Sequence, residues 1–288
     1  MLSKVLIKIR NRLRGAAPKD AFGQPPGASA HVPPPPVALH TERPAVDAID
    51  GGYSETGLNE YIVLKTSKWF GQASPDTLTI PPHLYGLLFI LESVSRKLGR
   101  RINVVDFGGG SPVIPWMVQN LGLGFLNRYR IIEQQTFLSH VPASWGALVA
   151  YGSDFGADQV DIVVISSVLP YISAAQADEL FDNVDRVRPG FVYLGRTSFL
   201  RDDYPLDEVY TIQESVFKDH GPQIPTGLDE IEKRVARYPR RHFKRAGVDE
   251  RLEKMGFQRI LTLQDDSGVS CIEGLGLYST NSLWERRA

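Results

Sequence analysis

The sequence lacks several features that mark particular protein classes. Among 288 residues there is one cysteine, Cys271, which excludes a scaffold stapled by disulfides. No Cys/His pair has the spacing of a zinc site, and we expect no bound metal. The longest apolar runs, 86–91 and 162–165, are too short to cross a bilayer. A net charge of −1 argues against a protein that binds nucleic acid.

The composition is otherwise that of a globular chain. Apolar residues make up 42% and charged residues 23%, a balance that allows a substantial core to be buried. At about 150 residues per domain, the length accommodates one large domain or two small ones.

Basic residues are concentrated in residues 1–15, which carry five basic and no acidic side chains. The rest of the chain has 27 basic and 33 acidic side chains, a net charge of −6. Helical spacing relates the apolar residues Leu2, Val5, Leu6, Ile9 and Leu13. The segment is predicted to be a basic amphipathic helix on an anionic membrane surface, or an ordinary helix on the protein's own core, or a frayed terminus. Lys8 interrupts the apolar stretch, so we do not expect a signal peptide.

Residues 16–48 hold eight of the chain's twenty prolines and eight alanines. Such a segment buries little surface and is predicted to be a flexible, extended linker. The folded domain is therefore expected over residues 49–288.

That domain alternates apolar strands with amphipathic helices. Strands are expected at 102–107, 129–133, 147–151, 160–165 and 191–194, and helices at 80–99, at 174–187 and at 247–255. A further helix is expected directly after the glycines at 108–110, with Ser111 as its N-cap and Pro112 as its first residue. The last two strands, 257–264 and 271–279, are joined by too few residues for a parallel crossover. The pattern predicts an α/β, doubly wound, mostly parallel seven-stranded sheet with an antiparallel last strand.

A glycine loop, Gly108-Gly109-Gly110, follows the first long strand directly. Glycines between a strand and a helix allow backbone N–H groups to approach a ligand. Asp106, just before the loop, would repel a pyrophosphate but suits a ligand with a cationic amino-acid tail. Val113 occupies the position of the third glycine in the dinucleotide motif. Both points favour S-adenosylmethionine over NAD, and the alternative is a tight turn in which Asp106 caps the next helix.

Polar residues also end the following strands. Glu133 stands 23 residues after Gly110, where a carboxylate can accept both ribose hydroxyls, and the alternative is a solvated glutamate. Asp154 could accept the adenine amino group and Phe155 could lie on the ring face, unless they are a loop aspartate and a core phenylalanine.

The fourth of these strands ends in Ser166 and Ser167, with Tyr171 close behind. Ligands of open α/β sheets bind at this carboxyl edge. These side chains are therefore candidates to meet the methyl donor or to orient the acceptor, and a helix-capping turn is the alternative.

In combination and order, these motifs resemble a bacterial family of class I S-adenosylmethionine-dependent methyltransferases found in O-antigen and capsule polysaccharide gene clusters. The resemblance runs from about residue 51 to 277 and rests on the segments 104–110, 131–134, 161–172, 196–199, around Gln213, 238–239 and 274–277. Pro170 and the pair Ser111-Pro112 depart from the family pattern. The resemblance implies a Rossmann-like fold.

Residues 200–245 are expected to form a cap insertion over the acceptor site, with Arg196 at its entrance. Basic residues crowd 233–245, which favours an anionic acceptor or, alternatively, a solvated helix face. If the acceptor is a hydroxyl, His242 or His220 is the candidate base, with Tyr171 as a positioning group.

We therefore expect a methyltransferase that uses S-adenosylmethionine to O-methylate a saccharide or lipid-linked glycan. The expected location is the cytoplasm, at the inner membrane face. One alternative is a non-catalytic binding or assembly module of a polysaccharide pathway. Another is an NAD-dependent oxidoreductase, which Asp106, the missing third glycine and the terminal hairpin all disfavour.

Overall fold

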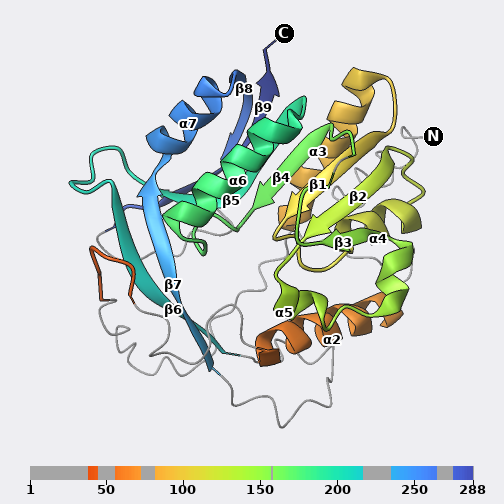
Figure 1. Cartoon of the computed structure of the whole chain (residues 1–288), viewed down its shortest axis with the longest axis horizontal. Coiled ribbons are helices and arrows are strands. Elements are labelled where there is room, and N and C mark those ends of the chain that lie inside the picture. Colours follow the sequence, from red (N-terminus) through yellow and green to blue (C-terminus); the bar gives the residue numbers. More distant parts are fainter. Residues whose placement is uncertain are drawn as a thin grey trace, which may run out of the picture. The chain divides into compact units, whose positions relative to one another are not determined.

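A computed structural model describes residues 38–44, 56–72, 82–156, 158–216, 235–264 and 275–287 (Figure 1). They form a sheet of nine strands with helices on both faces. Four predictions lie outside the described residues: the amphipathic segment 1–15, most of the linker, His220, and the turn before the last strand.

The centre of the sheet is parallel, in the order β3-β2-β1-β4-β5. These strands are β1 (Ile102–Phe107), β2 (Leu126–Ile132), β3 (Ala150–Gly152), β4 (Ile162–Ser166) and β5 (Phe191–Leu200). The last strand, β9 (Tyr278–Arg286), lies antiparallel between β5 and β8 (Phe257–Gln264). The doubly wound, mostly parallel fold with an antiparallel last strand is therefore confirmed.

Successive side chains of each central strand point to opposite faces of the sheet, so the sheet has two separate hydrophobic cores. Val104 and Val164 belong to one core, whereas Val105 and Val163 belong to the other. The first core is covered by α3 (Pro82–Leu98) and α4 (Val113–Asn120), and the second by α6 (Ala174–Val187) and α7 (Arg245–Lys254). Smaller helices complete this part: α2 (Thr56–Gln72), α5 (Gln135–Leu138) and the 3-10 helix η3 (Ala143–Ala147).

The sheet has nine strands rather than seven, because the insertion 200–245 contributes two. Strands β6 (Glu208–Val216) and β7 (Val235–Lys244) pair antiparallel, and the end of β7 continues the sheet beside Phe199 and Leu200 of β5. Much of the predicted cap is thus a sheet extension. The sequence signal was missed because β7 is rich in arginine, which is not typical of a buried strand.

Three boundaries also differ from expectation. The last strand runs from 278 to 286 rather than 271 to 279, since its polar residues Ser279–Ser282 are buried against neighbouring strands. Helix α4 begins at Val113 with Pro112 as its cap, so Ser111 is not the N-cap. Part of the expected third strand is the 3-10 helix η3, and β3 itself begins at Ala150.

The end of the predicted linker belongs to the folded unit. His40 and Tyr210 exchange both backbone hydrogen bonds, with N···O distances of 2.9 and 2.8 Å. Tyr210 lies on β6, whose outer edge offers unpaired backbone groups. Residues 38–44, which fall within the expected linker 16–48, therefore include a residue that pairs with the sheet.

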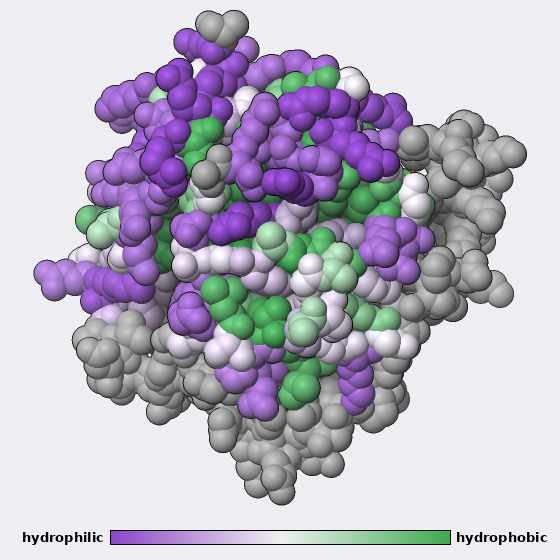
Figure 2. All heavy atoms as spheres, turned by 45° about the vertical axis from the view of Figure 1, so that its right-hand side comes forward, coloured by the Kyte–Doolittle hydropathy of each residue, from purple (hydrophilic) through white to green (hydrophobic). Residues whose placement is uncertain are grey.

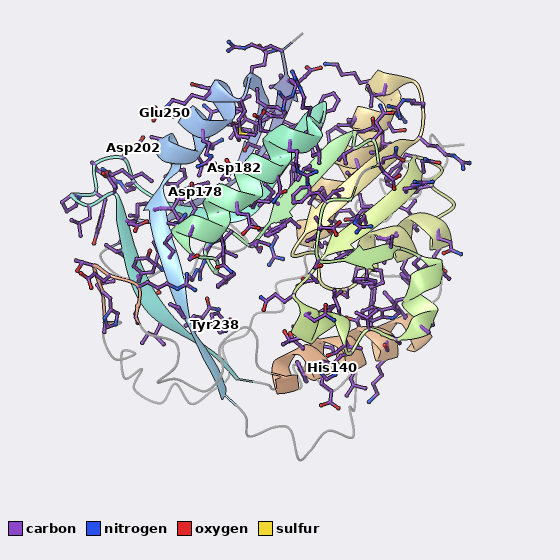
Figure 3. All side chains as sticks on the ribbon, in the orientation of Figure 1. His140, Asp178, Asp182, Asp202, Tyr238 and Glu250 are labelled. Carbon is purple, nitrogen blue, oxygen red and sulfur yellow. The ribbon has the colours of Figure 1, made fainter. Side chains whose placement is uncertain are left out.

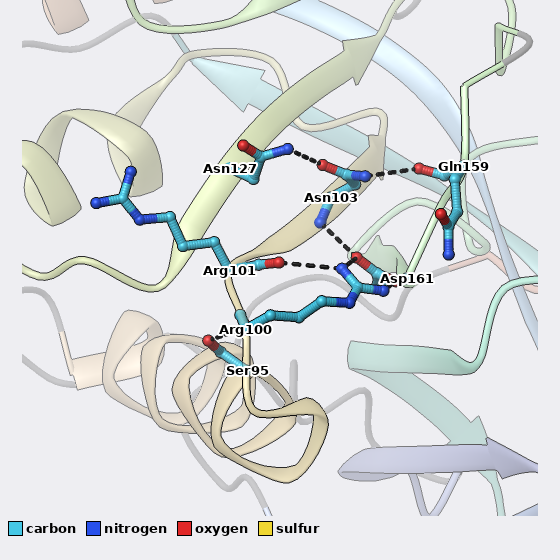
Figure 4. Close-up of polar contacts among 7 residues, drawn as sticks. All are labelled: Ser95, Arg100, Arg101, Asn103, Asn127, Gln159 and Asp161. Atoms are coloured by element: carbon cyan, nitrogen blue, oxygen red, sulfur yellow. Dashed lines mark hydrogen bonds and ion pairs between the residues drawn. The ribbon is translucent and has the colours of Figure 1, made fainter.

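The amino ends of three central strands are joined by Asp161, whose side chain is 5% exposed (Figure 4). Its carboxylate accepts from the Arg100 guanidinium at 2.5 and 2.9 Å and from the Asn103 backbone N–H at 2.8 Å. The Asn103 side chain reaches Asn127 and the Gln159 carbonyl. This network fixes the edge of the sheet opposite to the carboxyl ends of the strands.

Helices α6 and α7 are tied together by Arg251, which pairs with both Asp178 and Asp182 of α6; Figure 3 labels the two aspartates. On the face shown in Figure 2, hydrophilic residues cover the upper part and hydrophobic residues gather near the middle. No helix in the described ranges has the length and apolar character needed to cross a membrane.

We predict that Asp161→Ala lowers the free energy of unfolding by about 2–3 kcal/mol, because the partly buried Asn103 N–H and the Arg100 guanidinium lose their acceptor. Urea unfolding measures the change. Asp158→Ala is the matched control, since the Asp158–Arg128 pair is exposed and worth about 0.5 kcal/mol or less. Equal losses in the two variants would contradict the assignment of Asp161.

Candidate functional site

A cavity of about 500 Å³ lies at the carboxyl ends of β1, β2 and β4 and beside the middle of β5. Asp106 and Glu133 line it from β1 and the end of β2, and Ser166 and Arg196 line it from β4 and β5. Helices α2, α3 and α4 also contribute to its wall. The parallel register places these strand ends at one edge, which is where open α/β sheets bind ligands.

The glycine loop forms a close-fitting part of this cavity. Gly108 and Gly110 have positive φ angles of 68° and 60°, which favour glycine. A Cβ on Gly108 would approach Val168 to 2.5 Å, and one on Gly109 would collide with the Asp106 carboxylate. The loop backbone therefore packs on Val168 and Asp106 more closely than residues with side chains would allow.

Asp106 is buried beneath this loop. Its Oδ2 accepts a hydrogen bond from the Tyr129 hydroxyl at 2.6 Å. Burial raises the pKa of Asp106 to about 7, the Tyr129 hydrogen bond opposes that shift, and the charge of Glu133 adds to it. A cationic ligand group would restore the charged form, so the site is suited to an ammonium.

Glu133 holds the other side of the loop. Its Oε1 accepts from the Gly110 N–H at 2.9 Å, and its Oε2 accepts from the Gln134 N–H at 3.1 Å. Burial raises the pKa of Glu133, and these two N–H groups lower it in part. The Tyr151 hydroxyl donates to the Gly110 carbonyl at 3.0 Å. The loop and the carboxylate are thus held together before any ligand arrives.

The end of β4 and the middle of β5 carry three more of the predicted residues. Ser166, Ser167 and Arg196 all line the cavity. Ser167 and Arg196 have positive φ angles of 60° and 50°, unusual for residues other than glycine. Tyr171 also lines the cavity, and its hydroxyl donates to Gln213 Oε1 at 3.2 Å. The structure therefore brings these four side chains to one place.

Asp154 and Phe155 are not brought into the cavity. Asp154 is largely exposed and pairs with Arg130 at 3.0 Å. Phe155 is 3% exposed and stacks on Phe107 in the core, with ring centroids 6.2 Å apart. The placement of Phe155 fits the alternative of a core phenylalanine. Neither side chain lines the cavity.

His242 is corrected as a candidate base. It is fully buried on β7, and its Nε2 lies 2.9 Å from Thr211 Oγ1. Burial lowers the pKa of His242 to about 4, and the charge of Arg240 lowers it further. Because His242 is fully buried and does not line the cavity, it does not lie where a substrate in that cavity could reach it. His220 lies outside the described residues.

The expected basic surface on β7 is partly interior. Arg240 and Arg241 are buried, and so is Arg245, the first residue of α7. Arg241 pairs with Glu208 at 3.8 Å, and Arg245 pairs with Asp249 at 3.1 Å. Neither a solvated helix face nor an open anion site describes these three arginines.

Sequence analysis missed the contribution of α2. Lys65, Thr66 and Trp69 line the cavity from this helix, and the Trp69 ring lies 5.0 Å from that of Trp116. Helical spacing of Ile62, Thr66, Trp69 and Phe70 was the signal that predicts an amphipathic helix here. Within the described ranges, no group of three His, Cys, Asp or Glu side chains could hold a metal ion.

No protein-family model matches this sequence, and no curated protein sequence matches it. Among the solved structures that match, we describe three. The glycopeptide N-methyltransferase MtfA with S-adenosylmethionine is 17% identical, covering 69% of this chain and 87% of its own at a TM-score of 0.41. Magnesium protoporphyrin IX methyltransferase ChlM from Synechocystis PCC 6803 is 12% identical, with coverages of 80% and 95% and a TM-score of 0.41. The N-methyltransferase NodS from Bradyrhizobium japonicum WM9 is 12% identical, with coverages of 80% and 100% and a TM-score of 0.43.

Asp106 makes stability depend on pH. Because its pKa is raised in the folded state, the folded protein holds this proton more tightly, and stability falls as pH rises from about 4 to about 7. We predict that Asp106→Asn removes this penalty. Relative to the parent, the variant gains about 1–3 kcal/mol between pH 5 and pH 8 in urea unfolding. A constant difference across this range would contradict the assignment.

Proposed function

We propose that this chain is a methyltransferase that binds S-adenosylmethionine at the glycine loop. The observation that carries the proposal is a buried carboxylate, Asp106, in the lining of a cavity and directly beneath a glycine loop that packs too closely on it for a Cβ at Gly109. A loop of this shape accepts a ligand against the backbone, and the acid beneath it selects a cation rather than a pyrophosphate. This combination favours S-adenosylmethionine over NAD.

Two carboxylates would hold the donor. Asp106 would accept the ammonium of its amino-acid portion, with Tyr129 keeping the carboxylate in place. Glu133 would accept the ribose hydroxyls. Each of its two oxygens accepts one N–H donor, from the loop or from Gln134, and can accept a second. When bound, the donor supplies a methyl group on a positively charged sulfur. The residues of this chain then have mainly to align the acceptor with that methyl.

For the acceptor we propose a saccharide or lipid-linked glycan, methylated on oxygen. The polar groups at and just after the end of β4, Ser166, Ser167 and Tyr171, line the cavity beside the donor residues. Their hydroxyls can both donate to and accept from sugar hydroxyls. The proposal for the acceptor rests on this chemistry and on the family resemblance of the sequence.

A non-catalytic binding module is the second candidate. The observation that favours it is that no histidine lines the cavity in the part of the chain that the structure describes. Such a module would bind a nucleoside-like ligand or a glycan without turnover.

We predict that the full chain binds S-adenosylhomocysteine in calorimetry with a micromolar dissociation constant. Glu133→Ala removes the ribose acceptor, and Gly109→Asp fills the loop, so each weakens binding at least about tenfold, roughly one lost hydrogen bond to a charged group. Glu253→Ala, on the exposed side of α7, is the matched control and leaves binding unchanged.

Donor binding that survives both substitutions would overturn the site. Binding without methyl transfer to any glycan offered would favour the binding module. A rise in NADH fluorescence on mixing with the chain would instead favour the oxidoreductase.

We also propose peripheral membrane association through residues 1–15. The support is the sequence pattern alone, five basic residues beside an apolar face, at roughly 1 kcal/mol per basic residue near an anionic surface. We predict that the full chain floats with anionic vesicles and that replacing all five basic residues with Gln abolishes flotation. Neutral vesicles are the control. Equal flotation of the two proteins would remove the anchor.

A further inference from the structure

A bulge in β5 places Arg196 at the cavity. Strand β5 pairs with β9 on both sides of residues 195–196, but the register shifts between Leu194 and Thr197. Two residues of β5 therefore stand opposite Asn281 alone. Bulges of this kind bend a strand and redirect a side chain, and they are frequent next to binding sites.

The bulge requires an unfavourable backbone. Arg196 has a φ of 50°, in the left-handed region that arginine avoids. The neighbouring strand end is similar, because Ser167 has a φ of 60° and donates its N–H to the Gly195 carbonyl at 2.9 Å. Two adjacent non-glycine residues in this conformation, both lining one cavity, indicate a geometry kept for function.

Asn281 of β9 holds this geometry from behind. Its side chain Oδ1 accepts the Arg196 N–H at 2.7 Å, and the residue is 7% exposed. The bulge would otherwise leave that N–H without a partner on the neighbouring strand. A buried amide at the centre of a sheet is costly unless it is bonded, so this position has a specific use.

The side chain of Arg196 is available to a ligand. It is exposed and lines the cavity, and its guanidinium makes no hydrogen bond or ion pair with another residue of the described ranges. By contrast, the buried Arg241 and Arg245 each have a carboxylate partner. A planar guanidinium in a cavity suits a carboxylate or a phosphate.

Charge divides the cavity into two ends. Asp106 and Glu133 lie at β1 and β2, whereas Arg196 lies at β5. Two strand spacings separate β5 from β1, roughly 10 Å. The proposed donor site is at the acidic end, so Arg196 faces the part of the cavity that remains for the acceptor.

We propose that Arg196 binds an anionic group, a carboxylate or a phosphate, of the acceptor, and that Asn281 is the positioning residue that aims it. This inference rests on the proposed function, because Arg196 faces an acceptor only if the donor occupies the acidic end of the cavity. It narrows the substrate class to acidic molecules, such as a glycan that carries a uronic acid or a phosphate.

The test is calorimetry on the full chain saturated with S-adenosylhomocysteine. The probes are inorganic phosphate and D-glucuronate, with D-glucose as the neutral match. We expect one or both anions to bind at least fivefold more tightly than glucose, with an affinity that falls as NaCl is raised. Arg196→Gln removes this preference and its salt dependence, Arg196→Lys keeps part of it, and Asn281→Ala lowers anion affinity at least threefold. Neither Arg196→Gln nor Asn281→Ala changes glucose binding.

Arg201→Gln is the control, because Arg201 is an exposed arginine close in sequence that pairs with Asp203 outside the cavity lining. The proposal is overturned if the parent binds neither anion, or if Arg196→Gln binds them as the parent does. It is also overturned if Arg196→Gln weakens S-adenosylhomocysteine as strongly as the anions, which would make the donor's own carboxylate the partner. A chain that binds anions through Arg196 but no S-adenosylhomocysteine would sink the proposed function alone.

Discussion

The parallel pairing of β1 with β2 and β4 is the constraint on which the cavity depends. Parallel strands end at the same edge, so their register alone decides which polar residues meet there. Asp161 ties the opposite edge, where its carboxylate joins the beginnings of β1 and β4. A slip of one residue in β1 would exchange its two cores and turn Asp106 away from the loop.

Much of this arrangement follows from local patterns in the sequence. The apolar spacing of Leu180, Phe181 and Val184 predicted a helix at 174–187, which are the observed ends of α6. The structure adds a capping box at Ser173 that fixes the beginning of this helix. The glycine loop and Glu133 were found for a similar reason. Each stands at a strand end, and an apolar strand followed by glycine or an acid is a strong local signal.

Other parts depend on contacts that no local pattern contains. The sequence of β7 predicts a basic surface. In the structure Arg240, Arg241 and His242 are buried, because the neighbouring strands β5 and β6 lie elsewhere in the sequence and cover them. Whether a histidine is a base or a buried neutral ring is decided by those neighbours. The same holds for β9, whose polar residues look exposed and whose Asn281 acquires its purpose only opposite the bulge.

Trp69 of helix α2 makes ligand binding in the cavity observable by fluorescence. The chain has four tryptophans, and Trp69 is the one that lines the cavity. Trp116, Trp145 and Trp284 are each less than a tenth exposed, so their surroundings change little when a ligand enters. Trp69 also lies 5.0 Å from Trp116, close enough for excitation to pass between the rings. The intrinsic fluorescence of this protein is therefore a built-in optical reporter of what the cavity holds.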